Sequence, residues 1–127
     1  MKKVRYFVPA ILYYLLIFAL SSQHIDVNLP GHGLDKAAHL IEFGVLGLFL
    51  SLGYFNVLSS SAAVKAILVF ITGLPLGLLD ELHQHFVPGR TSALDDVAAD
   101  AAGIIAGILV YLYWEKRRKR PPQEPAA

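Results

Sequence analysis

The chain is organised around one stretch, Gly77-Leu78-Leu79-Asp80-Glu81-Leu82-His83-Gln84-His85-Phe86-Val87-Pro88-Gly89-Arg90. This stretch follows a long apolar run and brings together two carboxylates, two imidazoles, an amide, a Pro-Gly turn and an arginine. Polar groups at this density beside apolar segments need partners, because an unpaired polar or charged group in an apolar medium is costly. We therefore expect the rest of the chain to support this stretch.

The composition indicates a protein that lies in lipid. Apolar residues make up 55% of the 127 residues and charged residues only 17%, whereas soluble domains carry about 25% charge. The length fits a single domain. The chain has no cysteine, which excludes disulfides, thiolate nucleophiles and cysteine-based metal sites.

Four apolar segments predict an all-α, polytopic membrane protein built as a four-transmembrane-helix bundle. Each segment is close to the roughly 17–25 residues that cross a bilayer. They span residues 4–20, 35–55, 62–79 and 96–114, with loops at 21–34 and 80–95. The first segment has a competing interpretation as a signal peptide that ends at Ala19-Leu20-Ser21, a poor small-residue cleavage site.

The charges are segregated along the chain, although the net charge is only +1. Eight of the eleven basic residues lie in two terminal clusters, and all five histidines lie between the clusters. The positive-inside rule places both basic ends in the cytoplasm, so the loops at 21–34 and 80–95 face outward. We expect residues 1–114 to form the membrane domain and residues 115–127 a basic, then proline-rich, disordered cytoplasmic tail. No base-stacking motif accompanies the basic ends, so nucleic acid is not an expected partner.

Three of the expected helices carry polar residues at helical spacing, so that each set shares one face. The sets are Asp35, His39 and Glu42; Asp80 and Gln84, if the third helix continues that far; and Asp96 and Asp100. The last helix also carries Gly103-xxx-Gly107 on the same stripe, a small-xxx-small motif that allows close backbone approach in lipid. We expect the three polar stripes to converge just below the external surface.

The predicted site is a polar pocket open to the outside. Its expected ligand-binding residues are Asp35, Lys36, His39, Glu42, Asp80, Glu81, Gln84, Arg90, Asp96 and Asp100. Arg90 has two interpretations, as a salt-bridge partner of the acids or as a clamp for an anionic ligand. If the site is catalytic, the candidates are His39, Glu42, Asp80 and Glu81. We expect no cofactor; a divalent metal is kept open with His39, Asp35 and Asp80 as weak ligand candidates, because no tight ligand motif is present.

Two motifs resemble the VanZ-like family. The segment Asp35-Lys36-Ala37-Ala38-His39-Leu40-Ile41-Glu42-Phe43 is similar to the family pattern D-K-x-x-H-x-x-x-[FY]. The segment from Asp80 to Arg90, followed by Asp96 and Gly103, is similar to the second pattern, D-E-x-x-Q-x-[FY]-x-P-x-R with a later D and G. The family carries an asparagine where this chain has Asp100.

The resemblance implies a small multi-spanning protein of the bacterial inner membrane, in contact with the lipid bilayer. The namesake of the family is associated with low-level teicoplanin resistance, which nothing in this sequence indicates directly. The resemblance indicates where the protein lies and which residues belong to the motifs, more than it indicates what chemistry they perform.

Three hypotheses follow for function. In the first, the pocket binds a lipid head group or cell-wall precursor and modulates the cell envelope. In the second, His39 and the carboxylates act as a hydrolase or transferase on a lipid-linked phosphate or acyl group, although no serine or cysteine nucleophile lies within the motifs. In the third, the polar residues lock the protein to a membrane partner or to a second copy.

Overall fold

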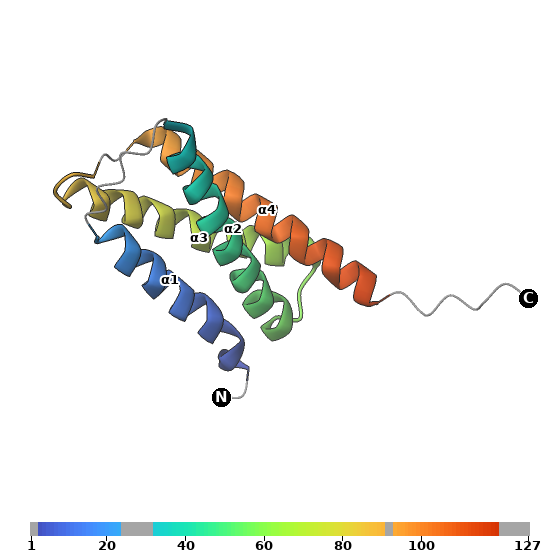
Figure 1. Cartoon of the computed structure of the whole chain (residues 1–127). Helices are drawn as coiled ribbons and strands as arrows, with labels where there is room; N and C mark the ends of the chain where they lie inside the picture. The colour runs from blue at the N-terminus through green and yellow to red at the C-terminus, as the bar shows by residue number, and fades with distance from the viewer. Residues whose placement is uncertain (1–2, 24–31, 91–92, 120–127) are drawn as a thin grey trace, which may run out of the picture.

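The computed structural model describes residues 3–23, 32–90 and 93–119, and the described part is helical without strands (Figure 1). A short 3-10 helix, η1 (Val4–Phe7), leads into α1 (Val8–Ser21). Three long helices follow: α2 (His32–Val57), α3 (Ala62–His85) and α4 (Leu94–Arg118). Residues Val4–Ser21 and the three long helices are each long and apolar enough to cross a membrane. The predicted all-α bundle with four spans is confirmed.

The four helices alternate in direction, which gives the bundle two distinct ends. At one end α1 and α3 finish and α2 and α4 begin; we call this the loop end. At the other end, the turn end, a short connection joins α2 to α3, and the start of α1 and the finish of α4 lie there too (Figure 1). The polar stretch of residues 77–90 therefore lies at the loop end.

The apolar core is centred on α2, whose Phe43, Leu46 and Leu50 are buried against the other helices. The buried core residues are Ala10, Ile17, Phe43, Leu46, Leu50, Val69, Ile104 and Ile108. The outer faces are also apolar: Ile67, Leu78 and Leu109 are each about half exposed or more. Continuous exposed apolar faces are not typical of a soluble monomer, and they fit helices that have lipid as their solvent.

Glycines let α2 and α4 pack backbone against backbone, as the Gly103-xxx-Gly107 motif predicts. A Cβ atom on Gly103 would collide with the carbonyl group of Leu40, and one on Gly107 would collide with the carbonyl oxygen of Gly44. On the facing helix, a Cβ on Gly47 would lie 2.7 Å from the carbonyl oxygen of Ile104. The polar residues of α2 and α4 lie one or two turns nearer the loop end than the glycines. The close approach of the two helices brings these residues within hydrogen-bonding distance of one another.

The prediction that residues 80–95 form a loop is wrong for the first part of that range, because α3 continues to His85. The side chain of Gln84 donates to Asp80 Oδ2 at 2.7 Å, one helical turn away. Polar residues that are paired within the bundle do not interrupt a helix, so the end of the apolar run does not mark the end of α3. The helix stops before Pro88-Gly89, where Gly89 has a φ of 82° that favours glycine.

The other helices also extend beyond the predicted spans. The second begins at His32 rather than at residue 35, and the fourth runs from Leu94 to Arg118 rather than over 96–114. The apolar pattern marks the lipid-facing part of a helix, whereas the helix itself continues into its polar ends. Much of the predicted loop at 21–34, and residues 120–127 of the predicted tail, lie outside the described residues.

A valine at position 103 tests the glycine contact. We expect Gly103→Val to destabilise the protein by at least about 1–3 kcal/mol, since the added atoms meet backbone and not a movable side chain. The measurement is the unfolding midpoint in detergent micelles. Ala102→Val, at the exposed neighbouring position, is the control and should change the midpoint little. Equal effects of the two substitutions would contradict the packing.

Candidate functional site

Polar side chains from all four helices meet at the loop end of the bundle. We use the term polar cluster for eight of them: Ser21, Lys36, His39, Asp80, Glu81, Gln84, Asp96 and Asp100. All except Lys36 are buried, with exposed fractions of 6% or less. Buried ionisable groups are expensive in a membrane protein unless they find partners inside the bundle, so their contacts decide what the cluster does.

His39 of α2 lies at the centre of the cluster, between α3 and α4. Its Nδ1 atom is 2.9 Å from Asp100 Oδ1, and its Nε2 atom is 3.6 Å from Glu81 Oε1. Asp100 is completely buried and His39 is 4% exposed. The imidazole therefore has a carboxylate at each nitrogen, and three helices meet on one ring.

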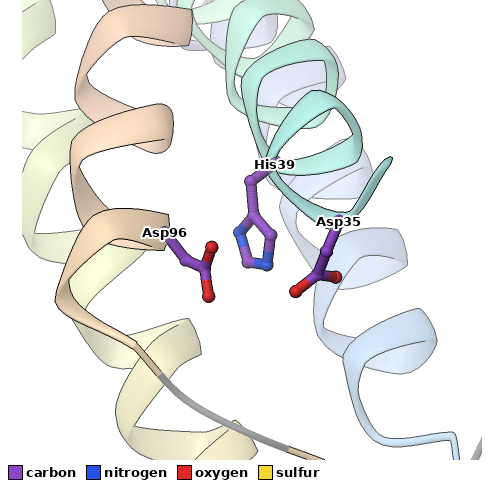
Figure 2. Close-up of side chains that lie close together, drawn as sticks. All are labelled: Asp35, His39 and Asp96. Carbon is purple, nitrogen blue, oxygen red and sulfur yellow. The ribbon is translucent and has the colours of Figure 1, made fainter. Parts of the chain in front are cut away.

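A second group of charges lies at the start of α2 and α4, where the helix dipoles favour acids. Figure 2 shows the His39 ring between Asp35, from the same helix, and Asp96, from α4. Lys36 neutralises part of this group, because its Nζ atom is 3.2 Å from Asp96 Oδ1 and also pairs with Asp95. This outer layer is more exposed than the ring contacts beneath it, since Asp35 is exposed and Lys36 is half-buried.

The two acids of α3 connect the remaining helices. Asp80 accepts hydrogen bonds from the Ser21 hydroxyl and from Gln84, both at 2.7 Å. Glu81 Oε2 accepts a hydrogen bond from the Ala93 N–H at 3.1 Å, which satisfies a backbone donor at the start of α4. Through these bonds α3 is tied to α1 on one side and to α4 on the other.

Arg90 lies beside the cluster and bonds to backbone. Its Nη2 atom donates to the carbonyl oxygen of Leu20, near the end of α1, at 3.3 Å. No ion pair within 4.0 Å joins Arg90 to an acid in the described part of the chain, so the interpretation as a direct salt-bridge partner finds no support there. Glu42 is half-buried and lies within electrostatic range of both Arg90 and His39.

Three buried polar atoms have no hydrogen-bond partner among the described residues. They are Glu81 Oε1, Asp100 Oδ2 and Arg90 Nε. Leaving a buried donor or acceptor unpaired costs roughly 1–3 kcal/mol, and more for a charged group, and such atoms are rare in native proteins. Two acceptors and one donor at the same end of the bundle are thus available to a ligand.

The structure brings together the predicted polar stripes and adds α1 as a fourth wall. The contribution of α1 was missed: Ser21 bonds to Asp80, and the hydroxyl of Ser22 lies 2.8 Å from Nε2 of His83. The available signal was the Ser21-Ser22 pair directly after the first apolar run, which was assigned to a loop. The weak metal candidate Asp80 bonds to Ser21 and Gln84 and belongs to neither of two groups with metal-ligand spacing, Asp35–His39–Asp96 and His39–Glu81–Asp100.

The comparison with known families covers almost the whole chain. A sequence model described as VanZ/LLP1 matches residues 4–115, a range that contains all four membrane-crossing segments up to Glu115 and every residue of the polar cluster. No curated protein and no solved structure gives a match to this chain. The chain therefore belongs to the VanZ/LLP1 family and is a multi-pass membrane protein.

Proposed function

We propose that this protein lies in the bacterial inner membrane with both termini in the cytoplasm, and that its loop end binds the phosphate-bearing head group of a lipid or lipid-linked cell-wall precursor. Binding of that amphiphile modulates the cell envelope. The observation that carries the proposal is a buried guanidinium nitrogen, Arg90 Nε, that donates no hydrogen bond to any described residue. Arginine presents a planar set of donors that matches phosphate geometry.

An apolar cavity that begins about one helical turn below the cluster and extends toward the turn end supports a ligand with a hydrocarbon chain. It has a volume of about 340 Å³ and lies between α1, α2 and α3. Two of its lining residues, Leu46 and Leu76, lie one helical turn below Glu42 and Asp80, respectively. A lipid tail in this cavity places its head group toward Arg90 and the polar cluster.

The distribution of aromatic and basic residues supports the orientation. At the turn end, Arg117 stacks over Tyr113 at 4.9 Å and Arg118 over Trp114 at 5.6 Å. Tyrosine and tryptophan with arginine beside them are typical of a membrane interface, and excess positive charge is typical of its cytoplasmic side. The acids gather at the opposite end, which is external in this orientation.

Single-cysteine variants test the orientation without background, because the chain has no cysteine. Leu94 is 88% exposed at the loop end, and Ser60 is exposed in the turn between α2 and α3. We expect a membrane-impermeant maleimide to label the Leu94→Cys variant in intact spheroplasts and the Ser60→Cys variant only in inverted vesicles. The reverse pattern would refute an external loop end.

The contribution of Arg90 is tested with phosphatidylglycerol as the anionic probe and phosphatidylcholine as its zwitterionic counterpart. We expect the full-length protein to retain phosphatidylglycerol preferentially in native mass spectrometry. Arg90→Gln should weaken that retention about tenfold or more, since hydrogen bonds to a charged group contribute about 1.5–3 kcal/mol and 1.4 kcal/mol is a factor of ten. Arg90→Lys should have an intermediate effect, because the charge remains and the planar fork is lost.

The control is Lys65→Gln, which removes a cation near the turn end and should leave retention unchanged. Gel filtration and helical circular dichroism confirm that each variant is folded. An unchanged lipid preference in both Arg90 variants, or an equal loss in Lys65→Gln, would overturn the proposal that this arginine binds the head group.

The contact between His39 and Asp100 favours a second candidate function, a lipid hydrolase or transferase. A histidine oriented by a carboxylate at Nδ1 is an arrangement used in general acid–base catalysis. Its Nε2 atom, however, faces Glu81, and the ring is 4% exposed, so substrate reaches it only if the cluster opens. Hydrolysis of the bound lipid by the purified protein, abolished by His39→Ala, would replace the binding proposal by this one.

A further inference from the structure

We propose that the protein binds one divalent transition-metal ion between α2, α3 and α4, with His39, Glu81 and Asp100 as its protein ligands. This inference goes beyond the proposed function and does not depend on the head group, because all three side chains are buried beneath the outer charges. One ligand atom from each residue lies within 4.8 Å of those from the other two. Each ligand comes from a different helix, so the ion would join the three helices at the loop end.

One of the distances already suits a shared ion. Zn²⁺ lies about 2.0–2.2 Å from a histidine nitrogen or carboxylate oxygen, so two of its ligand atoms are separated by no more than about 4.2 Å. The 3.6 Å between His39 Nε2 and Glu81 Oε1 falls within that limit, and it is longer than a direct hydrogen bond requires. The gap between these atoms is therefore wide enough for both to bind one ion.

One oxygen of each acid accepts no hydrogen bond from the described residues. Glu81 Oε1 faces the ring and Asp100 Oδ2 is buried, and neither has a hydrogen-bond partner among the described residues. The second oxygen of each acid has a structural bond: Glu81 Oε2 accepts from Ala93 N–H, and Asp100 Oδ1 is 2.9 Å from His39 Nδ1. As the side chains stand, Asp100 meets Nδ1 and Glu81 faces Nε2, so coordination of all three residues by one ion requires the Asp100 side chain or the His39 ring to rotate.

The charges of the three residues balance with a divalent ion. Glu81 and Asp100 together carry two negative charges when ionised, and no lysine or arginine pairs with either among the described residues. A protonated His39 neutralises one of these charges, whereas a divalent ion beside a neutral imidazole neutralises both. Uncompensated charge within a membrane-embedded bundle is unfavourable. A divalent ion therefore explains why two acids lie beside a single histidine.

The alternative group around the same ring, Asp35–His39–Asp96, is less suited to an ion. Figure 2 shows that its two acids lie on either side of His39 near the loop end. Asp96 is already paired with Lys36 at 3.2 Å, and Asp35 is exposed to solvent. A cation there would compete with the lysine, whereas the inner group has no lysine to displace.

The ligand types select the ion. An imidazole nitrogen favours zinc and other first-row transition metals, and carboxylates also accept manganese. Magnesium prefers an all-oxygen octahedron and keeps its waters, so it fits this mixed set less well. We therefore name Zn²⁺ and Mn²⁺ as the ions to test.

Metal analysis of the purified protein tests the site directly. Full-length protein, freed of any histidine tag because such a tag binds these ions, is stripped with EDTA and equilibrated separately with Zn²⁺ and Mn²⁺. After gel filtration, inductively coupled plasma mass spectrometry is expected to give one ion per chain. Glu81→Gln and Asp100→Asn should each weaken binding tenfold or more, while both keep an oxygen for the structural bonds of these side chains.

Asp80→Asn and Asp35→Asn are the matched controls, because they remove one neighbouring carboxylate each and should retain the ion. Asp100→Asn restores the amide of the family motif that the chain resembles, so it is expected to fold, and circular dichroism verifies this for all four variants. Failure of the unaltered protein to bind either ion, or binding that survives both Glu81→Gln and Asp100→Asn, would overturn the site. Loss only in Asp35→Asn would place the ion in the outer group and overturn it equally.

Discussion

The buried contact between His39 on α2 and Asp100 on α4 is the interaction on which the rest of the structure depends. A carboxylate with an exposed fraction of 0% in a membrane-spanning helix must find its partner inside the bundle. That partner is on another helix, so α2 and α4 have to approach closely at this depth. Gly103, one turn below Asp100, and Gly44, opposite it, make the approach sterically feasible. The glycines thus allow the close helix approach that the buried charge pair requires.

The same constraint explains how the peripheral helix α1 is held. Its outer face is apolar and exposed, and the cavity of about 340 Å³ separates part of it from α2 and α3. Polar bonds fix its position: Tyr14 donates to the carbonyl oxygen of Leu76 at 3.1 Å, and Ser21 donates to Asp80 at 2.7 Å. Hydrogen bonds between helices contribute in lipid, where apolar contact gives little preference for protein over solvent. A helix attached in this way leaves space for an amphiphile beside it.

Much of this arrangement could be predicted from the sequence, because lipid imposes simple rules. Hydrophobic length predicted the four spans, and helical spacing placed His39 and Asp100 on stripes that converge. The predicted end of α3 is wrong because the apolar run stops at Leu79, whereas Asp80, paired with Gln84 and Ser21, continues the helix. Gln84 lies one turn away on the same helix, but Ser21 lies on α1. A contact between two helices cannot be read from the local sequence pattern. For the same reason, the sequence alone does not show that His39 pairs with Glu81 rather than with one of the other acids.

The presence of Asp100 distinguishes this chain within the motif that it resembles. An asparagine at this position also offers an oxygen to His39 Nδ1 but adds no charge. The aspartate therefore keeps the contact between α2 and α4 and adds a negative charge whose second oxygen lacks a described partner. At this position a contact that packs two helices together also introduces a charge.

A double-mutant cycle on His39→Ala and Asp100→Ala measures how strongly the buried pair couples α2 to α4, with unfolding measured in mixed detergent micelles on metal-stripped protein. If the buried pair organises the bundle, the coupling free energy is expected to reach about 1 kcal/mol or more, as found for residues in direct contact. The exposed pair of Glu115 and Lys119, 2.8 Å apart on α4, serves as reference and should give no more than about 0.5 kcal/mol. A coupling for His39 and Asp100 no larger than this reference would show that the pair does not organise the bundle.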